Sequence, residues 1–255
     1  MRKHLVHCLL VLIVTLPTVA QTAAPAKAAT DLDPLALQVL KAVVDPIRNA
    51  KSFSFRILAA RDWLGTNDQI ITKFSASEFT VERPDKLHIK FRSQGEPVEL
   101  FFDGTGQTEL YSPSVKLYST ISTPKSIDGM LDEAAKKGIF IAVRNFLESD
   151  PYKSLTDGLM TAYVVGRTTI FDQEVHHLAF TEPGAEWQLW VVGGDKPSIR
   201  RLEVINKDKP HNPRIVVDFL DWDLNASPTD DMFVFHKPED AHEIEMLKLT
   251  AEGKK

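Results

Sequence analysis

Residues 83–106 read RPDKLHIKFRSQGEPVELFFDGTG, and this stretch decides the fold class of the chain. Apolar and polar residues alternate over 87–91 and again over 98–102, which predicts two strands that each bury one face. The short connection at 94–96 carries a glycine, and no helix has room to form between the two runs. Two strands joined in this way are typical of an antiparallel hairpin.

The same period of two continues outward in both directions along the chain. Phe53, Phe55 and Ile57 alternate with polar residues, and turn residues follow at 65–68 and at 112–114. Further strands are predicted at about 161–166, 174–182, 186–192, 198–206 and 213–222, with a short last strand at 232–236. Because a strongly twisted sheet of this size tends to curl, we expect a half-open barrel of about eleven antiparallel strands.

A helix is predicted before the sheet. Asp33-Pro34 supplies an acidic N-cap and a proline at the first helical position. Pro46 is expected to kink this helix or to end it early. The apolar stripe at helical period consists of Leu35, Val39, Val43 and Ile47, with Ala36, Leu40 and Val44 beside them.

The strand pattern breaks between about 124 and 160, where helical spacing returns. Ser126 is a predicted N-cap, and Gly138 lies just past the end of this helix. A second helical set comprises Phe140, Val143, Phe146 and Leu147, and Asp150-Pro151 begins a third piece. An amphipathic helix needs an apolar surface to cover. We therefore expect an α+β fold, mainly antiparallel β, in which these helices form a lid over the concave face of the sheet.

The N-terminus has the pattern of a secretory signal peptide. Two basic residues precede the apolar run 5–16, and small residues precede a cleavage site after Ala20. The alternative, a membrane anchor, is disfavoured because the run is shorter than the ~20 residues of a spanning helix. The expected organisation is a signal peptide at 1–20, a flexible leader at 21–32, one domain at 33–247 and a polar tail at 248–255.

Composition excludes several classes of protein. The 255 residues include a single cysteine, Cys8, so no disulfide can form within the chain. Because His7 rather than a small residue precedes it, Cys8 is a poor lipoprotein signal. The net charge of −5 argues against nucleic acid as a partner, since such binders normally carry a basic patch.

Motifs for catalysis are weak throughout the chain. Neither G-x-S-x-G nor H-E-x-x-H occurs. His176 and His177 are neighbours on a predicted strand and point to opposite faces, which is poor geometry for one metal ion. Asp221 and Asp223 share one side of a strand end, as paired acids do in glycosidases or calcium sites. No glycine-bearing loop with regular oxygen spacing surrounds them, so a solvated strand end is the favoured explanation. We expect no catalytic residue, no metal and no cofactor.

Several short motifs, in this order along the chain, resemble the periplasmic lipoprotein carriers LolA and LolB. A similar order of motifs also resembles an uncharacterised family of bacterial predicted periplasmic proteins in the same superfamily. The resemblance implies a periplasmic, eleven-stranded half-barrel with a helical lid over a cavity for acyl chains. The motifs are F-x-F (53–55), ERPDKL (82–87), FDG (102–104), LYS (110–112), TPKSIDGML (123–131), DPY (150–152), WQLW (187–190) and DW (221–222).

The resemblance also suggests which residues meet a ligand. In the carriers, the arginine of the R-P turn helps to hold the lid, and Arg83 occupies the matching position. Ile89 and Phe91 stand where the carriers tend to place tryptophan. The expected lid residues are Arg83, Ile127, Met130, Leu131, Phe140 and Phe146. The expected cavity residues are Phe53, Phe55, Leu87, Ile89, Phe91, Val98, Leu100, Phe102, Trp187 and Leu189.

Three functions remain open on the sequence. The first is a non-enzymatic binding or carrier protein for an apolar ligand such as an acyl chain, a lipid or a lipoprotein. The second is an envelope sensor or interaction module that binds a partner protein, and the third is a hydrolase acting through Asp221 and Asp223. The leading hypothesis is a monomeric carrier, compatible with peripheral contact to a membrane.

Overall fold

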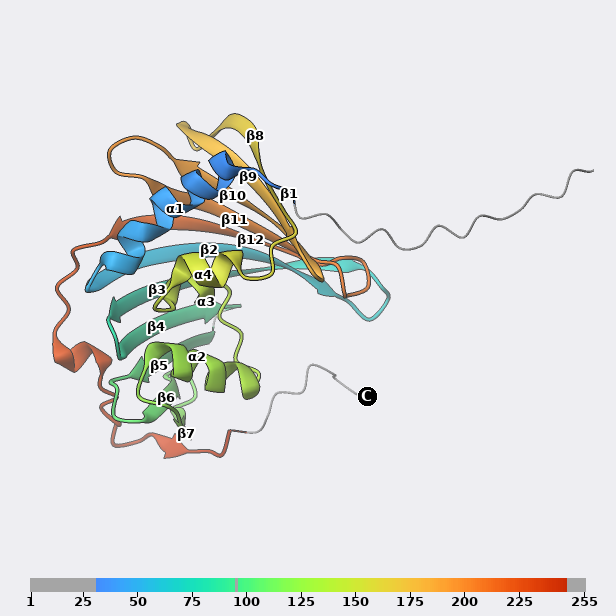
Figure 1. The fold of residues 1–255 in the computed structure, drawn as a ribbon. Coiled ribbons are helices and arrows are strands. Elements are labelled where there is room, and N and C mark those ends of the chain that lie inside the picture. Colours follow the sequence, from blue (N-terminus) through green and yellow to red (C-terminus); the bar gives the residue numbers. More distant parts are fainter. Residues whose placement is uncertain (1–30, 95, 247–255) are drawn as a thin grey trace, which may run out of the picture.

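The computed structural model describes residues 31–94 and 96–246, which fold around one large sheet (Figure 1). The predicted signal peptide with its cleavage site after Ala20, most of the leader and the C-terminal tail lie outside these residues. The strands are β1 (Asp31–Leu32), β2 (Ser52–Leu64), β3 (Ile70–Glu82), β4 (Lys86–Ser93), β5 (Glu96–Phe102), β6 (Gln107–Ser112), β7 (Leu117–Ser122), β8 (Thr161–Ile170), β9 (Gln173–Glu182), β10 (Ala185–Val192), β11 (Ser198–Asn206), β12 (Arg214–Asp223) and β13 (His242–Glu243).

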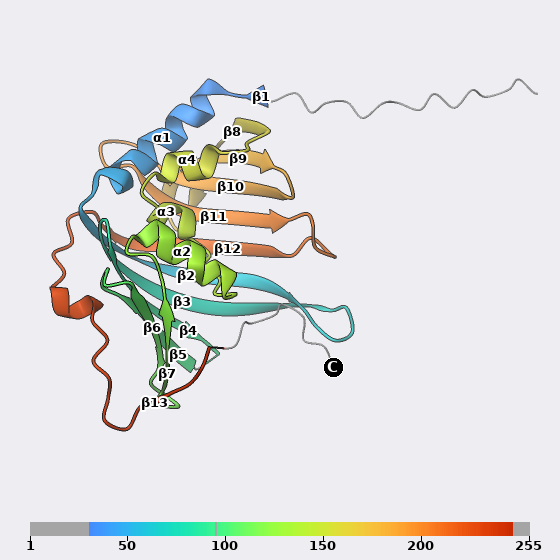
Figure 2. The ribbon, with the colours of Figure 1, turned by 60° about the horizontal axis from the view of Figure 1, so that its bottom comes forward.

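The sheet confirms the predicted antiparallel architecture. Its order is β1-β8-β9-β10-β11-β12-β2-β3-β4-β5-β6-β7-β13, so the two runs of consecutive hairpins join where β12 pairs with β2. Only the two-residue strands at the edges, β1 and β13, pair in parallel, and the other eleven are antiparallel. The two edges do not pair with each other, so the curled sheet stays open (Figure 2).

The four α-helices lie on the concave side of the sheet (Figure 1). Both predicted N-caps are made: Leu35 N donates to Asp33 Oδ1 at 2.8 Å and Gly129 N to Ser126 Oγ at 3.2 Å. Asp150, at the predicted start of the third helical piece, also acts as an N-cap and accepts from Lys153 N at 3.0 Å. None of the helices in the described ranges is long and apolar enough to cross a bilayer. The helices are α1 (Pro34–Asn49), α2 (Ile127–Lys136), α3 (Arg144–Leu147), α4 (Pro151–Thr156) and the 3₁₀ turn η1 (Asp230–Phe233).

Helix α1 does not end at Pro46 but continues to Asn49, and its buried face differs from the expected stripe. Leu35 is exposed, and the buried face instead comprises Ala36, Leu40, Val43, Val44 and Ile47. A strict four-residue spacing exceeds the helical repeat of 3.6 residues, so the predicted stripe drifts around the helix and its first residue turns to solvent.

Three other local expectations were wrong or incomplete. The segment expected as a strand at 232–236 begins within the 3₁₀ turn η1, and the last short strand is β13 instead. The second mid-chain helix shrinks to α3, because Gly138 turns the chain out of α2 with φ +84° and 139–143 follow as a loop. Residues 31–32, expected in the leader, form β1, where Asp31 N donates to Met160 O at 3.0 Å.

Candidate functional site

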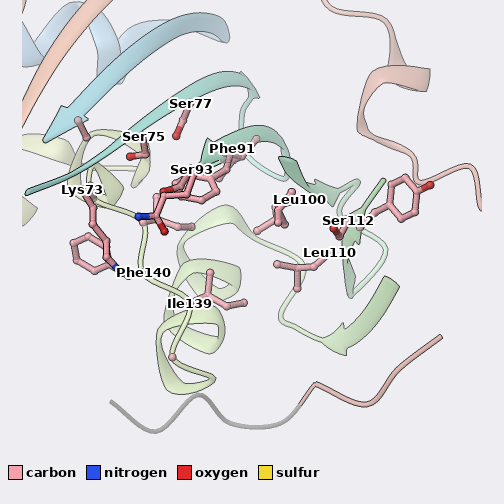
Figure 3. A pocket seen from close by; sticks show the side chains of 18 of the residues that line it. Lys73, Ser75, Ser77, Phe91, Ser93, Leu100, Leu110, Ser112, Ile139 and Phe140 are labelled. Atoms are coloured by element: carbon pink, nitrogen blue, oxygen red, sulfur yellow. The ribbon is translucent and has the colours of Figure 1, made fainter. Parts of the chain in front are cut away.

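A cavity of about 670 Å³ lies on the concave face of the sheet, beyond the part that the helices cover (Figure 3). Its walls come from β2 to β7, from Ile215 on β12 and from Ile244 and Met246 near the C-terminus. The segment 138–142, between α2 and α3, forms its remaining side. Most lining side chains are aliphatic or aromatic, so the space is suited to an apolar ligand.

The register of the strands explains why the side chains leave a space here. Residues paired across neighbouring strands point to the same face, so the inner face of β2 to β5 consists of successive rows. Bulky side chains fill the first two rows, whereas Ala59, Ser75 and Ser77 leave room in the third and fourth. The rows are Phe53, Val81, Leu87 and Phe102; then Phe55, Phe79, Ile89 and Leu100; then Ile57, Ser77, Phe91 and Val98; then Ala59, Ser75, Ser93 and Glu96; then Arg61 and Lys73; and then Trp63 and Ile71.

The segment 138–142 covers this space without filling it. Ile139, Phe140 and Ile141 all line the cavity, and the Phe140 side chain is 59 % exposed. The Arg61 guanidinium lies over the Phe140 ring, 4.4 Å from its centroid. One end of the cavity therefore combines exposed aromatic surface with positive charge (Figure 3).

The ten expected cavity residues divide between this pocket and the closed core. Ile89, Phe91, Val98 and Leu100 line the pocket. The other six are fully or almost fully buried in the core beneath the helices, where aromatic stacking fills the space; Phe180 and Trp187, for example, stack with centroids 3.8 Å apart. These six are Phe53, Phe55, Leu87, Phe102, Trp187 and Leu189.

The expected lid residues divide in the same way. Phe140 alone among them lines the pocket. Ile127, Met130 and Leu131 form the buried face of α2, and Phe146 on α3 is fully buried. Phe146 packs edge-on against Phe219 of β12, with ring centroids 5.4 Å apart. These apolar contacts attach the helices to the sheet.

Arg83 links the end of β3 to the helical layer. Its Nη1 donates to Leu147 O at 2.9 Å, and the guanidinium lies 5.2 Å from the centroid of the Phe53 ring. Nε and Nη2 are buried and have no hydrogen-bond partner among the described residues. Burial lowers the pKa of Arg83, and the negative charge of Asp128 opposes that shift.

Sequence reasoning missed the polar side of the pocket. Strand β3 carries Lys73, Ser75 and Ser77 on its inner face, so the alternation that places apolar residues inward at 79 and 81 is reversed over 73–77. Pairing it against β2 between the turns at 65–68 and 83–85 would have placed these residues opposite Arg61, Ala59 and Ile57.

The weaker catalytic candidates have structural contacts away from the pocket. Asp221 pairs with Arg56 at 2.5 Å between Oδ2 and Nε, and Asp223 Oδ1 accepts from Asn225 N at 2.9 Å. The His177 ring stacks on Trp190, and its Nε2 lies 2.7 Å from Gln188 Oε1. Over 31–94 and 96–246, no cluster of three or more His, Cys, Asp or Glu residues is arranged to hold a metal ion.

The fold and pocket define a class of protein: an open, curled antiparallel sheet that holds helices and an apolar cavity on its concave face. The chain belongs to the family described as "Predicted periplasmic protein (DUF2092)", whose model matches residues 36–247. A search of curated proteins finds no match.

Solved structures with a similar chain path are known at low sequence identity. LprF from Mycobacterium bovis is 12% identical, with a TM-score of 0.47, covering 82% of this chain and 99% of that one. The Mycobacterium tuberculosis lipoprotein LppX is 10% identical, with a TM-score of 0.41, covering 74% and 96%. A LolA superfamily protein from Nitrosomonas europaea is 10% identical, with a TM-score of 0.33, covering 78% and 97%.

Proposed function

We propose that this protein is an exported, non-enzymatic binding or carrier protein that holds an apolar ligand in the pocket between β2–β7 and the segment 138–142. The ligand class is an acyl chain, free or as part of a lipid or lipoprotein. The observation that carries the proposal is the cavity of about 670 Å³ with a mostly apolar lining. This volume lies within the ~300–1,000 Å³ typical of ligand pockets.

Burial of an acyl chain supplies enough free energy without a dedicated polar site. Each buried CH₂ group contributes about 0.8 kcal/mol, so a chain along Phe79, Ile89, Leu100 and Leu110 gains several times that amount. Other apolar side chains of the same lining are exposed to water, among them Phe91 at 39 % and Phe140 at 59 %. A ligand of this kind therefore replaces an unfavourable apolar surface.

Export supports the same proposal. The signal-peptide pattern at 1–20, with cleavage after Ala20, would deliver the protein across the inner membrane. The family to which the chain belongs is described as predicted periplasmic. An apolar ligand that must cross an aqueous compartment needs a protein that shields it from water.

Native mass spectrometry of the mature protein, purified from a bacterial periplasm, tests the proposal directly. We expect a reproducible adduct of lipid mass that organic extraction releases. A clean ligand-free mass that persists after lipids are added would contradict the proposal. If a protein partner also copurifies in stoichiometric amount, the alternative of an interaction module is favoured.

A matched pair of variants tests whether the ligand occupies this pocket. Ala59 and Ala60 are neighbours on β2 that face opposite sides of the sheet, and only Ala59 lines the cavity. We expect Ala59→Phe to weaken binding of Nile red, an uncharged apolar dye, by about tenfold or more, because the ring occupies the space of the ligand. Ala60→Phe adds the same ring outside and should leave dye fluorescence unchanged.

A second pair of variants tests the same pocket in case Ala59→Phe does not fold. Ser75→Phe places a ring in the same row of the cavity, and Ala76→Phe places one on the opposite face of β3. Circular dichroism establishes that each variant is folded before the dye titration. Equal dye affinity in folded Ala59→Phe, folded Ser75→Phe and the parent protein would place the apolar site elsewhere.

A further inference from the structure

The inner face of β2 and β3 changes in chemistry along its length. The rows nearest the helices are aromatic and aliphatic, the next two contain Ser77 and Ser75, and the row after them pairs Arg61 with Lys73, with Trp63 and Ile71 beyond it. From the helices outward, the lining on β2 and β3 therefore changes from apolar, through hydroxyl, to cationic, and the Trp63 ring follows at the outer end. This sequence of chemistries matches an amphiphile laid along the strands with its chain toward the helices.

Arg61 and Lys73 form an unusual pair. They are directly opposite each other across an antiparallel ladder, and like charges in that position are destabilising. Each cation instead contacts an aromatic ring: Arg61 lies 4.4 Å from the Phe140 centroid and Lys73 Nζ lies 4.0 Å from the Trp63 centroid. Neither makes an ion pair with any residue that the structure describes.

The charge of the pocket is opposite to that of the chain. The whole protein carries a net charge of −5. Over the described part of the chain, the residues that line the cavity include Arg61 and Lys73 but neither an aspartate nor a glutamate. A site with two cations and no carboxylate to balance them attracts an anion.

The hydroxyl groups between the charged and apolar rows extend this pattern. Ser77 is almost completely buried, and Ser75 is half-buried beside it on the inner face of β3. Both line the cavity, and neither side chain hydrogen-bonds to another of the described residues. Buried hydroxyls favour a partner, and the ester or hydroxyl oxygens next to a lipid headgroup are suitable ones.

From this geometry we infer that the pocket selects anionic amphiphiles, whose headgroup oxyanion binds between Arg61 and Lys73 while the acyl chain extends over Phe79, Ile89 and Leu100. The inference rests on the proposed function and adds to it the chemical class of the ligand. The shared chemistry is a carboxylate or phosphate on an acyl chain. Guanidinium and ammonium groups both bind such oxyanions through charge-assisted hydrogen bonds.

Displacement of Nile red by three ligands with the same chain tests this inference. Oleate and oleyl phosphate carry an anionic head, whereas oleyl alcohol is neutral. We expect each anionic ligand to displace the dye at a concentration at least about tenfold below that of the alcohol. Added salt should reduce this advantage without affecting the alcohol, because ions screen exposed charges. Inorganic phosphate alone tests the headgroup without a chain and should leave the dye bound.

The double variant Arg61→Gln/Lys73→Gln should bring the anionic and neutral ligands to equal displacement, with the alcohol unchanged. Arg61→Lys keeps the charge and should retain most of the preference. Lys90→Gln/Arg92→Gln is the matched control, since these two cations lie exposed on the neighbouring strand β4, outside the cavity lining. It lowers the net charge equally and should preserve the preference.

The outcomes separate this inference from the proposed function. If the native protein binds the dye and all three ligands displace it equally, the headgroup site is overturned while the apolar pocket stands. An equal loss of preference in the Lys90/Arg92 control also overturns it, because net charge would then explain the effect. If the native protein binds neither dye nor ligand, the proposed function itself fails.

Discussion

His88 is a titratable residue buried on the convex side of β4. It is 7 % exposed, stacks on Phe101 with centroids 4.6 Å apart, and its Nε2 lies 3.0 Å from Glu99 Oε2. Burial lowers the pKa of His88 and outweighs the opposite influence of Glu99. The neutral imidazole is therefore favoured in the folded protein. Through this one residue, the stability of the fold becomes sensitive to mild acid.

The sign of the pH dependence follows from that shift. In the unfolded chain, His88 has a pKa of about 6.5 and takes up a proton before the folded protein does. The free energy of unfolding should therefore fall as the pH drops through about 6.5 toward the folded pKa. His88→Gln does not titrate and keeps a donor for Glu99, so it should remove this part of the dependence.

Urea unfolding at about pH 7.5 and about pH 5.5, on either side of the ordinary histidine pKa, measures the effect. Burial raises the pKa of Glu109 and of Glu182, and protonation of these groups acts in the opposite direction. The informative quantity is therefore the difference between parent and variant. Identical losses of stability in both proteins would show that His88 does not contribute.

Helix α2 packs on the sheet through its buried face, and its first turn closely approaches the loop that precedes it. Gly129 lies one turn after the Ser126 N-cap, and a Cβ added to it would come within 2.5 Å of Pro124 Cβ and 2.9 Å of Pro124 Cγ. The glycine is therefore required by contact with the preceding loop rather than by its backbone angles. The helix tolerates this residue because Ile127, Met130 and Leu131 are buried.

Replacement of Gly129 tests this contact at the level of the element. Gly→Ala in a helix usually stabilises by roughly 1 kcal/mol, but here we expect Gly129→Ala to destabilise by about 1–3 kcal/mol through overpacking. Lys136→Ala, at an exposed position of the same helix, should change stability by less than ~0.5 kcal/mol. Thermal unfolding compares the three proteins, and a Gly129→Ala variant at least as stable as the parent would contradict the prediction.

On the scale of the whole molecule, one sheet supplies both the closed core and the pocket. Strands β2 and β3 have thirteen residues each and extend past the helical layer, as Figures 1 and 2 show. The covered part of their inner face is fully buried, and the uncovered part lines the cavity. Filling the cavity with a ligand therefore adds to the same apolar structure that stabilises the fold.

Ligand binding should raise the melting temperature of the whole protein. At a free ligand concentration of 100 Kd, linkage predicts about 2.7 kcal/mol of added stability, or roughly 5–10 °C for a chain of this size. Oleate should produce this shift in the parent and in Ala60→Phe, and a much smaller one in Ala59→Phe. Equal shifts in the two variants would show that the stabilising ligand does not occupy the pocket.

The sequence by itself determined the elements and their order. Alternation over 87–91 and 98–102, the turn residues between the strands and the helix starts at Asp33, Ser126 and Asp150 predicted an antiparallel sheet with one leading helix and a helical insert, and these are present. Such features are local, because each depends on residues within a few positions of one another. The signal peptide at 1–20 and the domain limits at 33 and 247 remain predictions.

Only the tertiary structure decided which inward residues meet the pocket. A period of two assigns Phe55 and Ile57 to the same face, but it does not tell how far the helices extend over that face, so Phe55 enters the core and Ile57 lines the cavity. The period of two also failed to identify Lys73 and Ser75 as pocket residues, because polar residues on an inner face do not follow the expected alternation. Their position follows from the pairing register between β2 and β3 rather than from the pattern within β3 alone.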